Sequence, residues 1–454
     1  METSPRLVDQ ARISPPPPQN PSDNDGSSAT GSGPLRAVGK VRWTICGMLF
    51  AATSINYIDR QILGILAPTL QHTIGWTDLQ YSYIISGFQF AYAVGLILAG
   101  RMVDRLGTRI GYAIIMEVWS LSAMSHALAR TVLGFAAARF FLGLGEAGNF
   151  PAAIKTTAEW FPQSERSLAT GVFNSGTSVG AILAPAIVPW ATLRYGWQAA
   201  FLMTGAFSAL WILGWLYYYR SPARHRTLTP EEFAYIQRDL NEPIKAVPWH
   251  QLLGHRQTWA FAAGKLLTDP IWWFLLYWLP LFLTKKFHLG LGQLAVPLVV
   301  IYNISTIGSV GGGWLPAFFH RHGMAMSRAR LSTMLLCASL VTPIFFASRV
   351  HSEWLAIAII SVAAAAHQGW SANLFTTASD MFPRSAVGSV VGIGATIGSI
   401  GGVLFSLGTG WILNLTHNYT IPFILSASAY LLALGLMQLI VPGSKSAVLT
   451  RESQ

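Results

Sequence analysis

The sequence predicts an all-α polytopic membrane protein with twelve transmembrane helices in two pseudo-symmetric bundles of six. Three observations support this fold class. First, 52% of the 454 residues are hydrophobic and only 11% are charged, a composition that excludes an ordinary soluble domain. Second, the chain contains twelve apolar segments, most of them about 20 to 25 residues long, which is enough to cross roughly 30 Å of hydrocarbon. Third, the two halves of the chain share an internal repeat.

The twelve predicted spans fall into two equal groups. They start near residues 43, 81, 110, 132, 167, 198, 259, 296, 329, 353, 385 and 420. The longest polar segment, Arg220–Thr258, separates the sixth span from the seventh, and within it Thr229 followed by Pro230 is typical of a helix start. We therefore expect bundles at 39–220 and 259–442, a cytoplasmic linker at 221–258, and cytoplasmic tails at 1–38 and 443–454, the first of them disordered.

The internal repeat becomes visible when the chain is compared with itself at an offset of 221 residues. The fourth and fifth spans then match the tenth and eleventh without a gap. The paired residues are Gly148 and Gly369, Thr156 and Thr377, Glu159 and Asp380, Phe161 and Phe382, Pro162 and Pro383, Gly171 and Gly392, Ser178 and Ser399, and Gly180 and Gly401. Duplicated halves around a central site are a common architecture of transporters.

The basic residues predict the orientation of the chain in the membrane. The expected cytoplasmic segments hold 22 of the 30 Lys and Arg residues, and the expected outer loops hold five. This asymmetry favours cytoplasmic positions for both termini. Because the basic residues are spread over many short connections, they do not form the single basic face that nucleic-acid binding needs.

The remaining three basic residues, Arg60, Arg139 and Lys265, lie inside predicted spans. A charged side chain at the bilayer centre costs at least about 2.5 to 3.5 kcal/mol, so such a residue usually faces a partner or a water-filled cavity. Along the first span, Tyr57 and Arg60 share a face, and Asp59 points about 100° away from it. This pattern favours a solute or proton site, and the alternative is a structural ion pair between helices.

In the fourth span, Arg139, Gly143 and Glu146 lie on one stripe at helical spacing. The glycine allows a neighbouring backbone to approach closely. Glu146 is the candidate proton carrier, since the protonation of a carboxylate in the membrane depends on its surroundings and on nearby arginines. Seven residues span about 10 Å of helix, which disfavours a direct Arg139–Glu146 pair and favours Asp59 as the partner of one of the two. A permanent Arg139–Glu146 pair that only stabilises the helix is the alternative.

The repeat places His367 at the position equivalent to Glu146, so both residues are expected to face one central cavity. His367 could titrate there or be a neutral histidine satisfied between helices. Trp370 and Asn373 share a face of the same span and could offer an aromatic platform and an amide to a sugar. The alternatives are a packing tryptophan and an amide hydrogen bond between helices.

Two further spans contribute candidate residues. Lys265 and Asp269 lie four residues apart in the seventh span, which predicts either a local ion pair or a lysine that contacts substrate or gates the cavity. In the second span, Gln89 and Tyr92 share a face, and we expect at least one of them to reach the cavity.

The connection between the second and third spans, Gly100–Arg109, resembles the signature loop of the major facilitator superfamily, and Arg321–Gly323 is a partial copy in the second half. Within that superfamily, Asn56–Arg60, Arg139–Pro151 and His367–Asn373 resemble the anion:cation symporter family and, among its members, the hexuronate transporters. The resemblance covers about residues 43–442. It implies two bundles that rock about a central cavity, proton-coupled uptake of organic anions, and the proton-carrier role for Glu146.

In the signature loop, Asp104, Arg105 and Arg109 are expected to form a gating latch at the cytoplasmic side. The expected latch partners are Glu159, Arg166, Asp380 and Arg384.

Together these observations predict an inner-membrane proton symporter for a small sugar acid, such as galacturonate or glucuronate. Its roles are predicted as follows: Arg60 and Tyr57 hold the carboxylate; Glu146, Asp59 and Arg139 carry the proton; Trp370, Asn373 and Gln368 contact the sugar ring. We expect a monomer in the lipid bilayer with no metal, cofactor or nucleic-acid partner. The alternatives are a carrier for an aldonate, an aromatic acid or a dicarboxylate, and a membrane sensor that transports nothing. An enzyme is disfavoured because no nucleophile–base pair, metal set or nucleotide-binding motif is evident.

Overall fold

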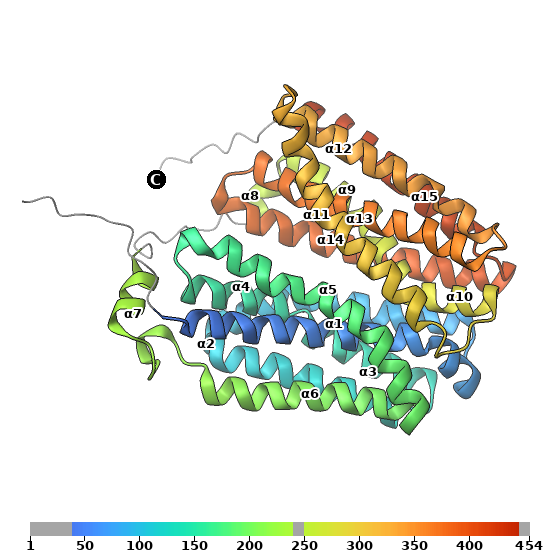
Figure 1. The fold of residues 1–454 in the computed structure, drawn as a ribbon, viewed down its shortest axis with the longest axis horizontal. Helices are drawn as coiled ribbons and strands as arrows, with labels where there is room; N and C mark the ends of the chain where they lie inside the picture. The colour runs from blue at the N-terminus through green and yellow to red at the C-terminus, as the bar shows by residue number, and fades with distance from the viewer. Residues whose placement is uncertain (1–38, 239–248, 445–454) are drawn as a thin grey trace, which may run out of the picture. The chain divides into compact units, whose positions relative to one another are not determined.

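The computed structural model describes residues 39–238 and 249–444 (Figure 1). In this part of the chain all regular structure is helical, which confirms the predicted fold class. The helices are α1 (Val41–Ile74), α2 (Asp78–Ser125), η1 (His126–Leu128), α3 (Val132–Glu146), α4 (Asn149–Trp160), α5 (Gln163–Tyr195), α6 (Trp197–Tyr218), η2 (Pro222–Arg224), α7 (Pro230–Gln237), α8 (Trp249–Leu252), α9 (Arg256–Tyr277), α10 (Leu279–Phe287), α11 (Ala295–Arg321), α12 (Met326–Val341), η3 (Thr342–Ser348), α13 (Glu353–Met381), α14 (Arg384–Thr416), α15 (Thr420–Ile440) and η4 (Pro442–Ser444).

Every predicted span lies in one of these helices or in a pair of consecutive helices. The second and third spans both belong to α2, which reverses at Gly107, where φ is 74° and glycine is strongly favoured. The fourth span consists of α3 and α4, and the seventh consists of α9 and α10, which are bent by 53°. The ninth span comprises α12 and η3.

By length and composition, eight helices in the described residues can cross a membrane, or nine if the bent pair α9–α10 counts as one span. The difference from twelve has three sources. The long α2 contains two spans but counts once, α3 and α4 are each too short alone, and α1 does not qualify. Buried polar side chains interrupt the apolar surface of α1, namely Asn56, Asp59, Arg60 and Gln61.

Within the compact unit Val38–Gln454, α1–α6 lie together and α9–α15 lie together (Figure 1). In the first group, α2 packs on α3 and α1 packs on α5; in the second, α11 packs on α13 and α9 packs on α14. The boundaries of the two bundles stay predictions. The predicted tails at 1–38 and 443–454 lie outside the described residues, except for residues 443 and 444, which belong to η4.

The linker contains the predicted helix, α7, after the short η2. Thr229 caps α7 by accepting a hydrogen bond from the Glu232 backbone N–H (3.2 Å), which confirms the helix start. Buried Glu232 and half-buried Glu165 of α5 both bind the guanidinium of Arg42, at 3.1 and 2.8 Å. Burial alone would raise the pKa of Glu165, but hydrogen bonds from Arg42 and Tyr235 outweigh it and lower the pKa. These contacts fasten α7 to the N-terminal ends of α1 and α5.

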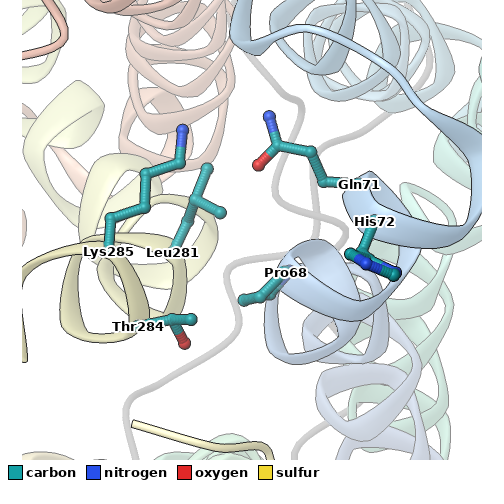
Figure 2. A pocket seen from close by; sticks show the side chains of 6 residues that line it. All are labelled: Pro68, Gln71, His72, Leu281, Thr284 and Lys285. Atoms are coloured by element: carbon teal, nitrogen blue, oxygen red, sulfur yellow. The ribbon is translucent and has the colours of Figure 1, made fainter. Parts of the chain in front are cut away.

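The two groups of helices meet tightly at the predicted outer end. Lys285 of α10 forms an ion pair with Asp78 of α2 (2.6 Å), and Gln71 of α1 donates a hydrogen bond to the same carboxylate (2.9 Å). A cavity of about 240 Å³ opens here. The residues that line it, labelled in Figure 2, are Pro68, Gln71, His72, Leu281, Thr284 and Lys285. Further inside, the Tyr81 hydroxyl donates to the Tyr277 carbonyl (2.9 Å). The first and second halves are therefore joined by hydrogen bonds at this end.

Candidate functional site

The centre of the first half holds a buried ion pair between two helices. Arg60 Nε of α1 donates to Glu146 Oε2 at the end of α3, at 2.9 Å, and both side chains are almost fully buried. Arg60 Nη2 also donates to Asn56 Oδ1, at 3.3 Å. The other oxygen of Glu146, Oε1, has no hydrogen-bond partner in the described part of the chain. Glu146 therefore neutralises Arg60 without using its full capacity as an acceptor.

Arg139 lies against this pair but does not bind Glu146. Its Nη2 donates to the backbone carbonyl of Arg60, at 2.8 Å, while its Nε and Nη1 lack partners among the described residues. The rings of Phe88 and Tyr277 lie 5.0 and 5.5 Å from its guanidinium. The site thus contains two arginines, and only Arg60 is paired directly with a carboxylate in the described residues. The Arg139 guanidinium therefore keeps donors that an anion can accept from.

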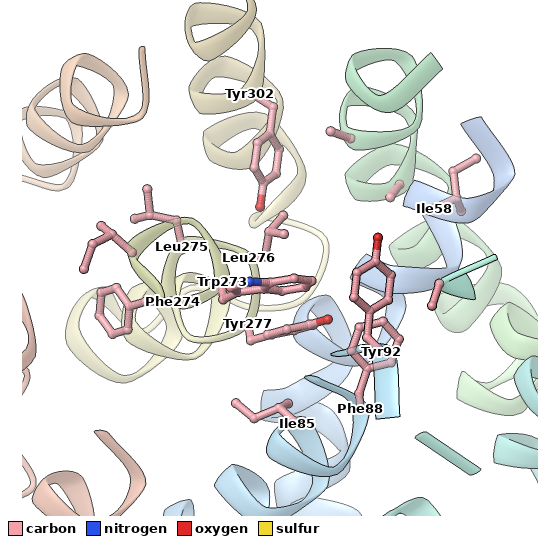
Figure 3. Packing of buried hydrophobic residues seen from close by; sticks show 14 of the residues in the cluster. Ile58, Ile85, Phe88, Tyr92, Trp273, Phe274, Leu275, Leu276, Tyr277 and Tyr302 are labelled. Carbon is pink, nitrogen blue, oxygen red and sulfur yellow. The ribbon is translucent and has the colours of Figure 1, made fainter. Parts of the chain in front are cut away.

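Aromatic rings from both halves surround the Arg60 guanidinium. The ring centroids lie 4.8 to 5.6 Å from its central carbon and belong to Tyr57, Phe88, Tyr92 and Trp273. Figure 3 shows Phe88 and Tyr92 of α2 facing Trp273 and Tyr277 of α9. Stacking holds a guanidinium in place without neutralising it. Arg60 is therefore oriented by rings and neutralised by Glu146.

Asp59 takes a different partner from the expected one. Its Oδ2 accepts a hydrogen bond from the Trp119 indole N–H of α2, at 2.6 Å, and its Oδ1 has no partner among the described residues. The expectation that Asp59 pairs directly with Arg139 or Glu146 is therefore wrong for this structure. The reason is helix rotation: the same turn that points Arg60 at Glu146 points Asp59 toward α2.

Glycines in α3 bring Glu146 to this position. A Cβ atom on Gly143 would lie 2.4 Å from the Phe88 carbonyl oxygen, and one on Gly145 would lie 2.7 Å from the Trp119 backbone nitrogen. Only glycine permits backbone contact this close. The predicted role of Gly143 in close helix packing is confirmed, and the same packing brings Glu146 within reach of α1.

Three predicted polar residues of the second half have partners close by, namely Lys265, Asp269 and His367. Lys265 and Asp269 of α9 form an ion pair at 2.7 Å. The His367 Nδ1 atom lies 2.5 Å from the Tyr430 hydroxyl, and its ring is stacked on Trp272 at 5.1 Å. Each of these contacts matches one of the two alternatives left open by the sequence: a local ion pair and a histidine bound between helices.

Trp370 and Asn373 also have partners within the second half. The Trp370 indole N–H donates to the Thr268 hydroxyl, at 3.2 Å, and its ring packs edge-on against Tyr430. The Asn373 amide donates to the carbonyls of Gly312 and Gly369, at 2.7 and 2.8 Å. In this structure Trp370 packs between helices, and the Asn373 amide joins α13 to α11.

The glutamines differ from these residues. Gln89 is completely buried, and neither its amide oxygen nor its amide nitrogen has a partner in the described residues. It lies where α2 meets α14, because a Cβ on Gly402 would be 3.3 Å from the Gln89 side chain. Gln368 is half-buried on α13. The buried Gln89 amide therefore keeps its donor and its acceptor for a ligand.

Comparison with known proteins identifies the family. The family model described as the Major Facilitator Superfamily matches residues 49–406. The chain belongs to this superfamily. It is therefore a multi-pass membrane transporter and not an enzyme, as the sequence predicts.

Individual relatives indicate where in the superfamily the similarity is found. The chain is 34% identical over 383 residues to a hexuronate transporter of Escherichia coli (strain K12), covering 83% of this chain and 88% of the relative. It is 37% identical over 288 residues to a galacturonate transporter of Dickeya chrysanthemi, covering 62% of this chain and 83% of the relative. The resemblance stated from the motifs is thus confirmed. The crystal structure of a D-xylose–proton symporter shares the fold, with a TM-score of 0.72, 14% identity, and coverage of 90% of this chain and 99% of that one.

The signature loop of this major facilitator protein makes contacts inside the first half. Asp104 pairs with Lys155 of α4 (2.8 Å), and Arg109 donates to the Leu216 carbonyl of α6 (2.6 Å), while Arg105 is exposed.

The expected latch partners also stay within their own halves in the contacts described. Glu159 accepts from Thr108 and Tyr219, Arg166 donates to the carbonyls of Phe161 and Ala158, and Asp380 pairs with Arg330. The Arg384 side chain lies outside the described residues. The gating role of the loop stays a prediction.

Sequence reasoning missed four residues of this site. Trp273 and Tyr277 contact the arginines, as does Phe88, and Trp119 binds Asp59. A signal for the first two existed, because Lys265, Asp269, Trp273 and Tyr277 follow each other at intervals of four residues and so form one stripe along α9. No metal-binding group of three or more His, Cys, Asp or Glu residues occurs in the described residues.

Proposed function

We propose that this transporter is a proton-coupled symporter that imports a small sugar acid, a hexuronate such as galacturonate or glucuronate. The ion pair between Arg60 and Glu146 carries this proposal. The relatives support the substrate class, since two of them are a hexuronate and a galacturonate transporter. We place the protein in the cell inner membrane as a monomer. Both termini lie in the cytoplasm in this proposal, as the distribution of basic residues favours.

The ion pair explains how proton and substrate become coupled. Arg60 is buried, so leaving its charge unpaired is costly. Glu146 neutralises it when no substrate is present. A proton that binds Glu146 removes this counter-charge, and the carboxylate of the sugar acid then replaces it on Arg60. A proton and an anion therefore enter the site together, and neither is favoured alone.

The other residues support these two roles. Tyr57 and Tyr92 stack on Arg60 and keep its planar group facing the substrate carboxylate. Asp59 and Arg139 adjust the charge around Glu146, and Gln89, Lys265, Gln368, Trp370 and Asn373 contact the sugar. Because Trp370 and Asn373 have partners in this structure, their contacts with substrate require a rearrangement in which substrate hydroxyls replace Thr268 and the backbone carbonyls. Asp104, Arg105 and Arg109 form the gate that closes the cytoplasmic side of the cavity.

The proposal is tested by uptake into proteoliposomes with an imposed proton gradient. Labelled galacturonate and glucuronate should accumulate above the outside concentration, and a protonophore should abolish this accumulation. Gluconate, benzoate and succinate serve as competitors, because strong competition by one of them would support another organic anion as the substrate. If none of these acids moves protons into the vesicles, a non-transporting sensor becomes the better explanation.

A further inference from the structure

A second buried ion pair lies on the other side of the site. The Lys265 ammonium and the Asp269 carboxylate are 2.7 Å apart, and their side chains are only 7% and 19% exposed. The facing surface of α14 has glycines at this point: a Cβ on Gly398 would lie 2.4 Å from Asp269 Oδ2, and one on Gly394 would lie 3.2 Å from Lys265 Cγ. α14 therefore leaves room for the pair.

The position of this pair follows from the geometry of α9. Trp273 follows Asp269 by one helical turn, and its ring lies 5.3 Å from the Arg60 guanidinium. Since one turn rises 5.4 Å, the ion pair is on the order of 10 Å from Arg60. An extended six-carbon acid with a hydrogen bond at each end covers such a distance.

The charges of the two positions differ. Arg60 becomes free for an anion when Glu146 is protonated, whereas Lys265 keeps its own counter-ion one turn away on the same helix. A hydroxyl or carbonyl at the far end of a substrate can hydrogen-bond to Lys265 or Asp269 without adding charge. A second carboxylate at that end would lie beside the Asp269 carboxylate, and like charges repel strongly in a site with little water.

We infer that Asp269 is a specificity-determining residue that excludes diacids: it neutralises Lys265, so the site accepts sugar acids with one carboxylate and rejects those with a carboxylate at both ends. This inference rests on the proposed function, because it takes a sugar acid bound by Arg60 as its starting point. It adds the selectivity between uronates and hexaric acids to that function, and it uses repulsion of the wrong substrate as well as attraction of the right one.

The test compares binding of galacturonate, a monoacid, and galactarate, a diacid, to the purified full chain by calorimetry. The wild type should favour galacturonate. Asp269→Asn leaves Lys265 charged and unpaired, so the ratio of galactarate to galacturonate affinity should rise at least about tenfold. The double variant Lys265→Met/Asp269→Asn should lose this gain, because the added affinity comes from the lysine. Glu353→Gln removes an acidic charge from the first turn of α13 in the same half and should leave the ratio unchanged.

The outcomes separate the two proposals. If the wild type binds galacturonate but the ratio is the same in Asp269→Asn, or rises equally in the double variant, the role of Asp269 is rejected and the proposed function stands. If the wild type binds no uronate, the proposed function fails and the inference fails with it. Should Asp269→Asn not fold, Asp269→Ser removes the same charge with a smaller side chain, and the same ratio decides.

Discussion

Glu146 and His367 occupy equivalent positions in the two halves, yet their surroundings differ in kind. Glu146 binds Arg60 of another helix and leaves one oxygen without a partner in the described residues. His367 is hydrogen-bonded to Tyr430 and stacked on Trp272. A buried polar group without a partner costs about 1 to 3 kcal/mol. Glu146 therefore keeps an acceptor atom that a ligand can satisfy, while the Nδ1 atom of His367 already has a partner.

The same contrast appears in the packing beneath these residues. Gly143 lets α3 touch the backbone of α2, whereas the equivalent position in the second half is Ala364, which is fully buried. In the second half the equivalent approach is as close, but the glycine lies on the other helix: a Cβ on Gly308 of α11 would lie 2.2 Å from the Ala365 carbonyl oxygen of α13. The repeat therefore preserves close packing and changes which helix carries the glycine, so pseudo-symmetry places the residues and local packing decides their chemistry.

The largest expected effect comes from Glu146→Gln. The amide has the shape of glutamate but does not gain or lose a proton at physiological pH, so proton-driven accumulation of galacturonate should be abolished. The Arg60 charge then has no permanent counter-ion, and substrate binding and counterflow should persist. Uptake into proteoliposomes with a proton gradient, followed by counterflow without one, separates the two activities. Uphill uptake at the wild-type rate would remove Glu146 from the coupling mechanism.

Arg60→Lys should come next in magnitude. The guanidinium donates to Glu146 and Asn56 at once and is stacked between rings, which an ammonium cannot reproduce. A charge-assisted hydrogen bond contributes about 1.5 to 3 kcal/mol, so the affinity for galacturonate should fall at least about tenfold. Calorimetric titration measures it directly. An unchanged affinity would show that the substrate carboxylate binds elsewhere, with Arg139 as the next candidate.

Features within one helix can be predicted from the sequence, whereas contacts between helices cannot. Spans can be located because twenty apolar residues in a row are a strong signal. Tyr57 and Arg60 can be placed on one face because helical spacing is fixed, and the two side chains do lie against each other. The partner of Glu146 could not be found, since it depends on how α1 and α3 are rotated against each other. That rotation follows from contacts such as Gly143 on Phe88, which join residues 55 positions apart and leave no periodic trace.

An intermediate effect is expected from exchanging the two packing residues. Gly143→Ala places a methyl group against the Phe88 carbonyl, and overpacking of this kind costs about 1 to 3 kcal/mol. Ala364→Gly in the second half creates no clash and should cost at most about 1 kcal/mol. Thermal unfolding of the two variants in the same detergent gives the order. If Ala364→Gly lowers the melting temperature more, the close packing of α3 against α2 does not depend on Gly143.

The smallest effect on coupling should come from His367→Gln. This variant introduces glutamine, as Glu146→Gln does, at the equivalent position of the second half. Glutamine loses the stacking on Trp272 and weakens the contact with Tyr430, so a loss of about 1 kcal/mol in stability is expected. Accumulation of galacturonate should persist, and its dependence on external pH should match that of the wild type, because the proposed proton carrier is Glu146 in the first half. A variant that accumulates nothing although it folds and binds substrate would place a proton-carrying group in each half. The asymmetry between the halves would then lie in their partners alone.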